Sequence, residues 1–252
     1  MIIYIKITDN ILTYCFGKVI NIQRIESTYS FLLTKILALI NPVKKSIKKT
    51  ECIVHVYLNN KSLNILLNDG YMNECNLFKS YIEDLNKGVV WADQDFKSSN
   101  HFYNPTKRKE LFGRKNAMDL ALNYHEKALK YWSMKKYNKA MFYFGATLHL
   151  IQDMTVPQHA NIRLLDNHHQ YEKFVSRAYQ NVNEFKIESG AYLLDSVRDY
   201  IRFNSRVAIK IYNKFKNIKD DDTRLYRTTR CCLPLAIRTT AGAMVLFYRE
   251  IA

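Results

Sequence analysis

The scarcity of turn residues constrains the fold of this chain more than any other feature. Its 252 residues include only 7 glycines and 4 prolines. Sandwiches and barrels made of strands need frequent turns and are usually richer in both residue types. The chain is 48% hydrophobic, and a chain of this length can bury one sizeable core or at most two small ones. The composition therefore favours an all-α fold.

Apolar residues recur at helical spacing from about residue 53 onward, which predicts a series of amphipathic helices. The first expected helix covers residues 54–70 and ends at an Asn-Asp-Gly turn signal. Residues 89–116 lack this periodicity but contain several aromatic side chains, so a packed functional loop is expected there. Further helices are expected at residues 75–88, 117–136, 137–154, 171–185, 191–215 and 233–251.

Residues 1–42 are predicted to form an N-terminal extension of uncertain role, followed by a single multi-helix domain at residues 43–252. Within the extension, residues 29–42 have a short apolar centre interrupted by Lys35. This pattern fits a packed helix, an interfacial amphipathic helix or a degenerate signal sequence. The signal sequence is the weakest interpretation, because no small-residue cleavage site follows. No run of 18 apolar residues is present, so no transmembrane segment is expected.

The chain is strongly basic, with 38 Lys and Arg residues against 23 Asp and Glu residues and a formal net charge of +15. Such a charge favours an anionic partner: a phosphate compound, nucleic acid or an acidic lipid surface. The alternative is a soluble protein that is merely basic. Net charge alone does not choose among these.

The five cysteines do not indicate a disulfide framework, because their number is odd and their spacing is irregular. Two of them are adjacent and would pair with each other only under strain. The pattern fits a reducing compartment or simple core positions. These residues are Cys15, Cys52, Cys75, Cys231 and Cys232.

The segment LHLIQDMTVPQHA, residues 148–160, places polar groups inside an otherwise apolar helix. His149 and Asp153 are four residues apart and therefore share one helical face. A buried imidazole and carboxylate need partners. They would form a structural pair, a catalytic acid/base pair or two ligands of a metal ion, and taken alone the pair favours the structural interpretation.

Other histidines and carboxylates change that balance in favour of a metal site. His168 and Glu172 repeat the four-residue spacing, and His159 lies between the two pairs, beyond a predicted helix break at residues 155–157. Nitrogen and carboxylate ligands drawn from several helices are typical of metal centres inside helical bundles. His125 is interpreted as an ordinary helix residue, and His168 is preferred to its neighbour His169 because Glu172 follows it by four residues. The remaining candidates are His55, Asp93 and His101.

The order of these motifs resembles the bacterial zinc-dependent phospholipases C, which include phosphatidylcholine-cleaving enzymes and the catalytic domain of the alpha-toxins. The family pattern is H-x-x-x-D-x-x-x-x-x-H, with proline two residues before the last histidine, followed by H-x-x-Y/F-E. This chain reads HLIQDMTVPQH at residues 149–159 and HHQYEKFV at residues 168–175. HVYLNNKSLNIL is similar to the family's first histidine helix, GVVWADQDFKSSNHFYNP to its A-D…H-F-Y-D-P loop and RTTAGAMVLFY to its last helix.

The resemblance implies an all-α domain with a zinc cluster held between helices. Two to three zinc ions (Zn2+) are the implied cofactors, with Asp153 bridging two of them. Asp93 is also implied as the general base, or as the group that orients the attacking water. The implied ligand sets are Asp93, His101, His149 and Asp153 for one ion, His159, His168 and Glu172 for a second, and His55 with Asp153 for a third.

The same resemblance implies a zinc-dependent phosphodiester hydrolase of the phospholipase C type. It would hydrolyse phospholipids to diacylglycerol and a phosphorylated head group, acting as a peripheral monomer at a membrane surface. Nucleic acid is not the expected partner. The family is usually secreted, but no convincing signal peptide is recognised here, so a cytoplasmic or peripheral membrane location is considered as well.

Two departures from the family pattern bear on these implications. In the family the third ion is completed by an N-terminal tryptophan, at a position that falls near Pro42 here. Neither tryptophan of this chain is there, so Glu51 and, more weakly, Cys52 are candidate substitutes. Gln94 and Ser98 stand where choline-cleaving enzymes place aromatics, so an aromatic cage for a quaternary ammonium is not evident.

Two rival functions follow from the same residues. One is a related zinc-dependent single-strand nuclease, which the net charge suits. Those nucleases carry an aspartate where this chain has Glu172, so the phospholipase is favoured. The other rival is a degenerate, non-catalytic homologue that lacks the third metal.

Overall fold

The computed structural model describes residues 52–94, 101–105, 116–161 and 168–252, together with the backbone of three short strands nearer the N-terminus. The chain divides into two compact units. Their residues are Met1–Lys49 with Lys109–Arg114, and Thr50–Arg108 with Lys115–Ala252. The predicted boundary between residues 42 and 43 lies outside the described residues and stays a prediction.

The smaller unit contains a three-stranded antiparallel sheet. Its strands are β1 (Ile7–Thr8), β2 (Ile11–Thr13) and β3 (Val19–Asn21), and they are paired in chain order. In this register β1 and β2 pair at Ile7 and Leu12, and β2 and β3 pair at Leu12 and Ile20.

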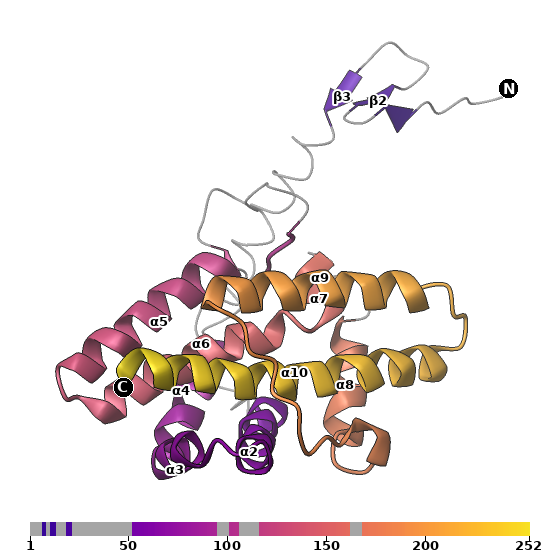
Figure 1. The fold of residues 1–252 in the computed structure, drawn as a ribbon. Coiled ribbons are helices and arrows are strands. Elements are labelled where there is room, and N and C mark those ends of the chain that lie inside the picture. Colours follow the sequence, from indigo (N-terminus) through magenta and orange to yellow (C-terminus); the bar gives the residue numbers. More distant parts are fainter. Residues whose placement is uncertain are drawn as a thin grey trace, which may run out of the picture. The chain divides into compact units, whose positions relative to one another are not determined.

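The larger unit is helical in every regular element that the structure describes, which confirms the all-α prediction (Figure 1). The helices are α2 (Ile53–Asn68), α3 (Met72–Ser80), α4 (Ile82–Gln94), α5 (Ala117–Ser133), α6 (Tyr137–Asp153), α7 (Pro157–Asn161), α8 (His168–Ala178), η2 (Asn183–Phe185), α9 (Val197–Phe215) and α10 (Asp221–Ile251).

Helix α6 lies at the centre of this unit, packed between α4 and α5. Every residue of α6 from Phe144 to Asp153 is buried. A helix that is buried on all sides has no solvent face for its polar residues, so these must find partners inside the protein. The last turns of α6 carry three such residues, His149, Gln152 and Asp153.

Two glycines allow α4 and α6 to touch through their backbones. A Cβ atom at Gly145 of α6 would overlap the carbonyl oxygen of Leu85, and one at Gly88 of α4 would overlap that of Phe142. Only a residue without a side chain fits at these two crossings. The close contact brings the end of α4, and with it Asp93, towards the end of α6.

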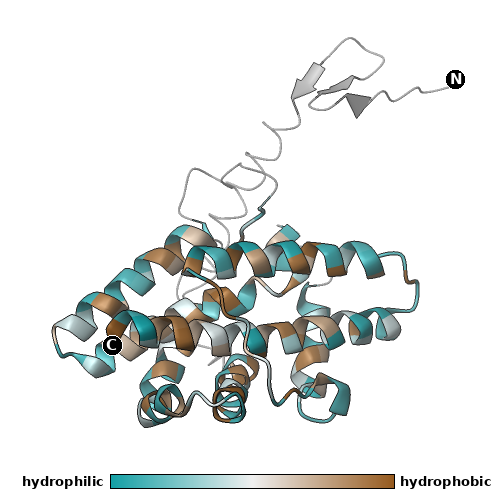
Figure 2. Cartoon of the chain, viewed as in Figure 1, coloured by the Kyte–Doolittle hydropathy of each residue, from teal (hydrophilic) through white to brown (hydrophobic). Residues whose placement is uncertain are grey.

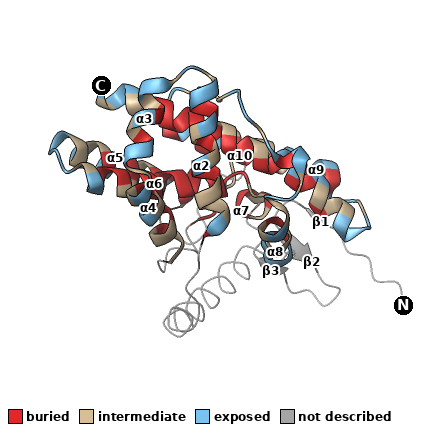
Figure 3. Cartoon of the chain, turned by 90° about the horizontal axis from the view of Figure 1, so that it is seen from below, coloured by how far each residue is buried: buried red, intermediate tan, exposed pale blue. Residues whose placement is uncertain are grey.

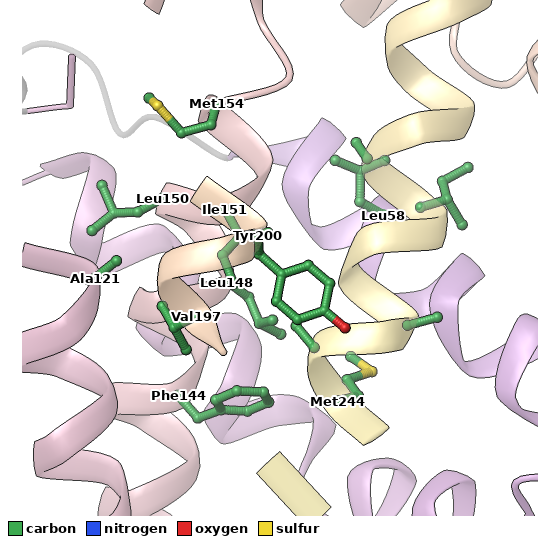
Figure 4. Close-up of a cluster of buried hydrophobic side chains, with 14 of the residues drawn as sticks. Leu58, Ala121, Phe144, Leu148, Leu150, Ile151, Met154, Val197, Tyr200 and Met244 are labelled. Carbon is green, nitrogen blue, oxygen red and sulfur yellow. The ribbon is translucent and has the colours of Figure 1, made fainter. Parts of the chain in front are cut away.

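Helix α9 packs against the same end of α6. Its Asn204 side chain donates a 2.8 Å hydrogen bond to the backbone carbonyl of Ile151. Tyr200 of α9 lies among buried side chains of α6 that include Phe144 and Leu148 (Figure 4). The Tyr200 hydroxyl donates a hydrogen bond to the carbonyl of Tyr192, so this buried polar atom is satisfied.

Helices α3 and α4 replace the single helix expected at residues 75–88, with a break at Tyr81. Gly88, expected to end a helix, lies inside α4, which continues to Gln94 because Gly88 packs against α6 instead of forming a turn. The first residues of the expected loop at 89–116 are therefore helical.

Helix α10 begins at Asp221, twelve residues before the expected start, because the Asp220 side chain caps it by accepting a hydrogen bond from the Thr223 amide. Its length and composition would allow it to cross a membrane, but 72% of its apolar window is buried within this fold. Hydrophilic and hydrophobic residues alternate along it (Figure 2). We therefore interpret α10 as a core helix.

Four cysteines are described, and all are free thiols. The adjacent pair does not form a disulfide, in agreement with the expectation from the sequence, and Cys15 lies outside the described residues. The free cysteines are Cys52, Cys75, Cys231 and Cys232.

Candidate metal centre

Five helices and one connecting segment carry the predicted site residues to one region of the larger unit. His149 and Asp153 stand in the last turns of α6, which ends at Asp153. The chain then breaks, as predicted, and α7 begins at Pro157, where a missing backbone N–H is tolerated. The other predicted ligands lie on the first turn of α2 (His55), the end of α4 (Asp93), the segment 101–105 (His101), α7 (His159) and the start of α8 (His168, Glu172).

The Asp153 carboxylate is the point on which four histidines converge. Its Oδ2 atom lies 3.0 Å from His101 Nδ1, 3.2 Å from His149 Nε2 and 3.8 Å from His159 Nδ1. Its Oδ1 atom lies 3.6 Å from His55 Nε2. Asp153 is only 4% exposed, so solvent contributes little to stabilising its charge.

The site residues form two groups of potential metal ligands. His55, His149 and Asp153 make up the first, and His159, His168 and Glu172 the second; in each, one atom from every residue lies within 4.8 Å of the others. Figure 3 shows the helices that carry them, with the buried end of α6 near α2 and α7.

The hydrogen-bonding pattern around Asp153 fits metal ligands better than a structural ion pair. His149 is 1% exposed, yet among the described residues neither of its ring nitrogens has a hydrogen-bond partner, and neither does Asp153 Oδ2. Leaving such an atom unpaired costs about 1–3 kcal/mol. Nitrogen and carboxylate oxygen atoms that converge without hydrogen-bond geometry are suited to a shared cation, and this donor set is the one that zinc takes. The residues present therefore fit zinc.

Burial and neighbouring charges set the protonation of these groups. Burial opposes ionisation of Asp153, but the rings of His149 and His159 outweigh it and hold the pKa of this carboxyl well below its usual range. Burial lowers the pKa of His159 to about 4. His159 is consequently neutral at pH 7, which is the state that binds a metal.

His159 is oriented by its neighbours. Its Nδ1 atom donates a 3.2 Å hydrogen bond to the backbone carbonyl of His101, and Phe102 stacks on its ring with the centroids 5.0 Å apart. Its Nε2 atom then faces His168 Nε2 at 2.9 Å, and the same nitrogen of His168 lies 3.3 Å from Glu172. Fixing one ring nitrogen in this way is how proteins aim the other at a metal.

A buried amide network, which the sequence analysis missed, orients His55. Its Nδ1 atom lies 2.8 Å from the Oε1 atom of Gln152, which leaves Nε2 directed towards Asp153. The Gln152 amide nitrogen donates in turn to Asn59 at 2.9 Å and to Thr240 at 3.1 Å. The only sequence signal for Gln152 is its place beside Asp153 in an apolar helix.

Asp93 belongs to neither three-residue group but lies beside them. The Cys52 thiol donates a 3.0 Å hydrogen bond to Asp93 Oδ2. Burial opposes ionisation of Asp93, but His149 and this hydrogen bond outweigh it, and the pKa of the carboxyl is lowered. Cys52 itself stands at the N-terminal end of α2 with a left-handed backbone (φ 41°). Glu51, the stronger candidate from the sequence, lies outside the described residues.

His125 and His169, which the sequence does not favour as ligands, lie in neither group. His125 pairs instead with Glu250 at 2.7 Å, and His169 is exposed on α8.

The sequence profile of the zinc-dependent phospholipase C family matches residues 54–228, which include every predicted site residue. The chain belongs to this family. Among its relatives, a phospholipase C of Listeria monocytogenes is 25% identical over 186 residues, covering 68% of this chain and 64% of the relative.

Solved structures of this family share the fold. The alpha-toxin of Clostridium perfringens from an avian strain aligns with a TM-score of 0.68 and 19% identity, over 79% of this chain and 63% of the toxin. The alpha-toxin of Clostridium absonum aligns with a TM-score of 0.68 and 16% identity, over 81% of this chain and 65% of the toxin. This chain thus spans just under two thirds of the length of these family members.

Proposed function

We propose that this protein is a zinc-dependent phospholipase C that hydrolyses phospholipids to diacylglycerol and a phosphorylated head group. The observation that carries the proposal is the presence of two groups of potential metal ligands, one of them containing the buried Asp153 carboxylate, in a chain of this family. The match to the phospholipase C family favours this function over the nuclease and over the non-catalytic homologue.

The described residues support a division of roles within the centre. His55, His149 and Asp153 would hold one zinc ion, with His101 beside them, and His159, His168 and Glu172 would hold another. When bound, zinc supplies positive charge that acidifies water and polarises a phosphoryl oxygen. Two to three ions are proposed in all.

Asp93 is proposed as the residue that orients the attacking water. The Cys52 thiol occupies its Oδ2 atom, so the carboxylate is fixed in direction at the end of α4. Its lowered pKa keeps it ionised at neutral pH, and an ionised carboxylate accepts a hydrogen bond from water. We propose a monomer that acts on phospholipid presented at a membrane surface.

The proposal is tested with zinc-loaded protein, measured for bound metal and for hydrolysis of phosphatidylcholine, phosphatidylserine and single-stranded DNA. We expect diacylglycerol release from lipid. Loss of a residue that only hydrogen-bonds to a metal ligand lowers metal affinity by about 10- to 100-fold. Asp153→Asn removes a proposed ligand itself, so it should lower zinc affinity by more than this and should abolish hydrolysis. Asp195→Asn, an exposed aspartate between η2 and α9, is the matched control and should change neither.

Each other outcome selects a rival function. Cleavage of DNA without cleavage of lipid would identify a nuclease. Bound zinc with no hydrolysis of any substrate would identify a non-catalytic homologue. Full zinc binding by Asp153→Asn would remove the central role assigned to this carboxylate.

A further inference from the structure

The outer face of helix α9 carries a row of positive charge that the metal centre does not use. Six residues of α9 are exposed, and five of them are Lys or Arg. Asn213 is the sixth. The cations recur at every fourth position and are Arg198, Arg202, Arg206, Lys210 and Lys214.

These side chains are available for an external partner. Within the described part of the chain, no Asp or Glu lies within ion-pair distance of any of the five, whereas Lys61, Lys87 and Arg224 elsewhere do have carboxylate partners. The only carboxylate on α9, Asp199, is half-buried at its first turn and bonds to the capping Ser196. A row of like charges four residues apart is mildly destabilising for a helix, so its presence calls for a compensating interaction.

The geometry of a helix identifies the cations that can act together. Four residues advance an α-helix by a full turn and about 40°, so the row slopes across the outer face. The central three, Arg202, Arg206 and Lys210, therefore lie within about 80° of arc and span roughly 12 Å along the axis. Arg198 and Lys214 extend the row by one turn at each end.

The opposite face of α9 connects this row to the metal centre. Asn204, between Arg202 and Arg206, donates a hydrogen bond to the Ile151 carbonyl, next to Gln152 and Asp153 in α6. Helix α9 also packs against α7, which carries His159. Figure 3 shows these buried and exposed sides along α9. Only helix α9 itself would therefore separate a surface bound to the row from the helices that carry the candidate ligands.

We propose that this row docks the protein onto the surface of an anionic phospholipid bilayer. The choice of lipid as the partner rests on the proposed function. The choice of anionic head groups rests on their charge complementarity to the row. A planar array of phosphate and carboxylate groups suits guanidinium and ammonium groups held in a row. Single-stranded nucleic acid fits less well, because its binding surfaces interleave aromatic side chains and no exposed residue of α9 is aromatic.

The test measures sedimentation of the full zinc-loaded chain with phosphatidylcholine vesicles that contain, or lack, phosphatidylserine. The test variant is Arg202→Gln/Arg206→Gln/Lys210→Gln. The matched control, Lys79→Gln/Lys130→Gln/Lys136→Gln, removes three exposed charges from α3, from α5 and from the turn before α6. Each cation near an anionic surface contributes about fivefold to binding, so the test variant should bind phosphatidylserine vesicles about 100-fold more weakly and the control nearly as wild type.

Three further measurements decide between explanations. Wild-type binding should weaken as salt is raised, because the interaction is exposed to solvent. Hydrolysis of a short-chain phospholipid below its micellar concentration should be equal in wild type and test variant, which shows that the centre is intact. Binding of single-stranded DNA should be no more sensitive to the test variant than to the control.

The proposal is overturned if the test variant binds phosphatidylserine vesicles with the same affinity as the wild type. It is also overturned if wild-type binding does not depend on phosphatidylserine. Loss of DNA binding with unchanged vesicle binding would also overturn it and would assign the row to nucleic acid. If no variant hydrolyses lipid but vesicle binding still depends on the row, the proposed function fails and this inference stands.

Discussion

Gln152 links the protein core to the candidate metal centre. Its side chain is 1% exposed and bonds to His55, Asn59 and Thr240, which come from α2 and α10. A buried amide whose hydrogen bonds are all satisfied stabilises one specific arrangement of the surrounding helices. The same contact selects which nitrogen of His55 is free, so one residue serves both packing and ligand orientation.

Gln152→Leu tests this role. Leucine has a similar volume but leaves the partners of the amide unpaired, which should lower the free energy of unfolding by roughly 1–3 kcal/mol. Because His55 then loses its orientation, zinc affinity should fall by about 10- to 100-fold. Urea unfolding and metal titration measure the two effects. Gln180→Leu, at an exposed position, is the control, and unchanged zinc affinity in Gln152→Leu would contradict the orienting role.

At the scale of elements, the backbone contact between α4 and α6 sets the distance between Asp93 and the ligands on α6. Gly88 and Gly145 face the opposite helix so closely that a methyl group has no room. Side chains of ordinary size would separate the axes and move the end of α4. The two glycines thus act on the site from well outside it.

Gly145→Ala tests the contact. A Cβ atom here meets a backbone carbonyl, which cannot rotate away. The free energy of unfolding should therefore fall by at least about 3 kcal/mol, the upper end of the usual range for an overpacked core. Zinc affinity should fall as well, because α6 must shift. Gly70→Ala is the comparison: it has a positive φ of 86° but open space around it, so it should cost only about 1–2 kcal/mol and leave zinc binding unchanged. Equal effects of the two would refute the packing argument.

At the scale of the whole molecule, the ligand cluster couples metal binding to folding. Four histidines and a carboxylate from separate segments meet only in the folded chain, so zinc held by them would bind the native state and would stabilise it.

Removal of zinc by a chelator should therefore lower the melting temperature. A free zinc concentration 100 times the dissociation constant contributes about 2.7 kcal/mol, which corresponds to roughly 5–10 °C for a domain of this size. Differential scanning calorimetry with and without chelator gives the shift. Asp153→Asn should show little of it, and an equal shift in that variant would place the stabilising zinc elsewhere.

Much of the fold follows from local sequence patterns. The scarcity of glycine and proline and the helical periodicity predicted an all-α domain, and the break before Pro157 was correctly placed. Gly88 was the clearest error, because a glycine that ends a helix and one that admits a neighbouring helix look alike in sequence. The early start of α10 was also missed, although its cap at Asp220 is a short-range contact.

Local spacing is enough to show which pairs of candidate ligands share a face, His149 with Asp153 and His168 with Glu172, because residues four apart in a helix are neighbours whatever surrounds them. The approach of His55 and His101 to Asp153, the bond from Cys52 to Asp93 and the orientation of His55 by Gln152 are evident only in the folded chain. These contacts join residues up to 98 positions apart in the sequence, His55 and Asp153. They depend on how the helices pack, which no local spacing specifies.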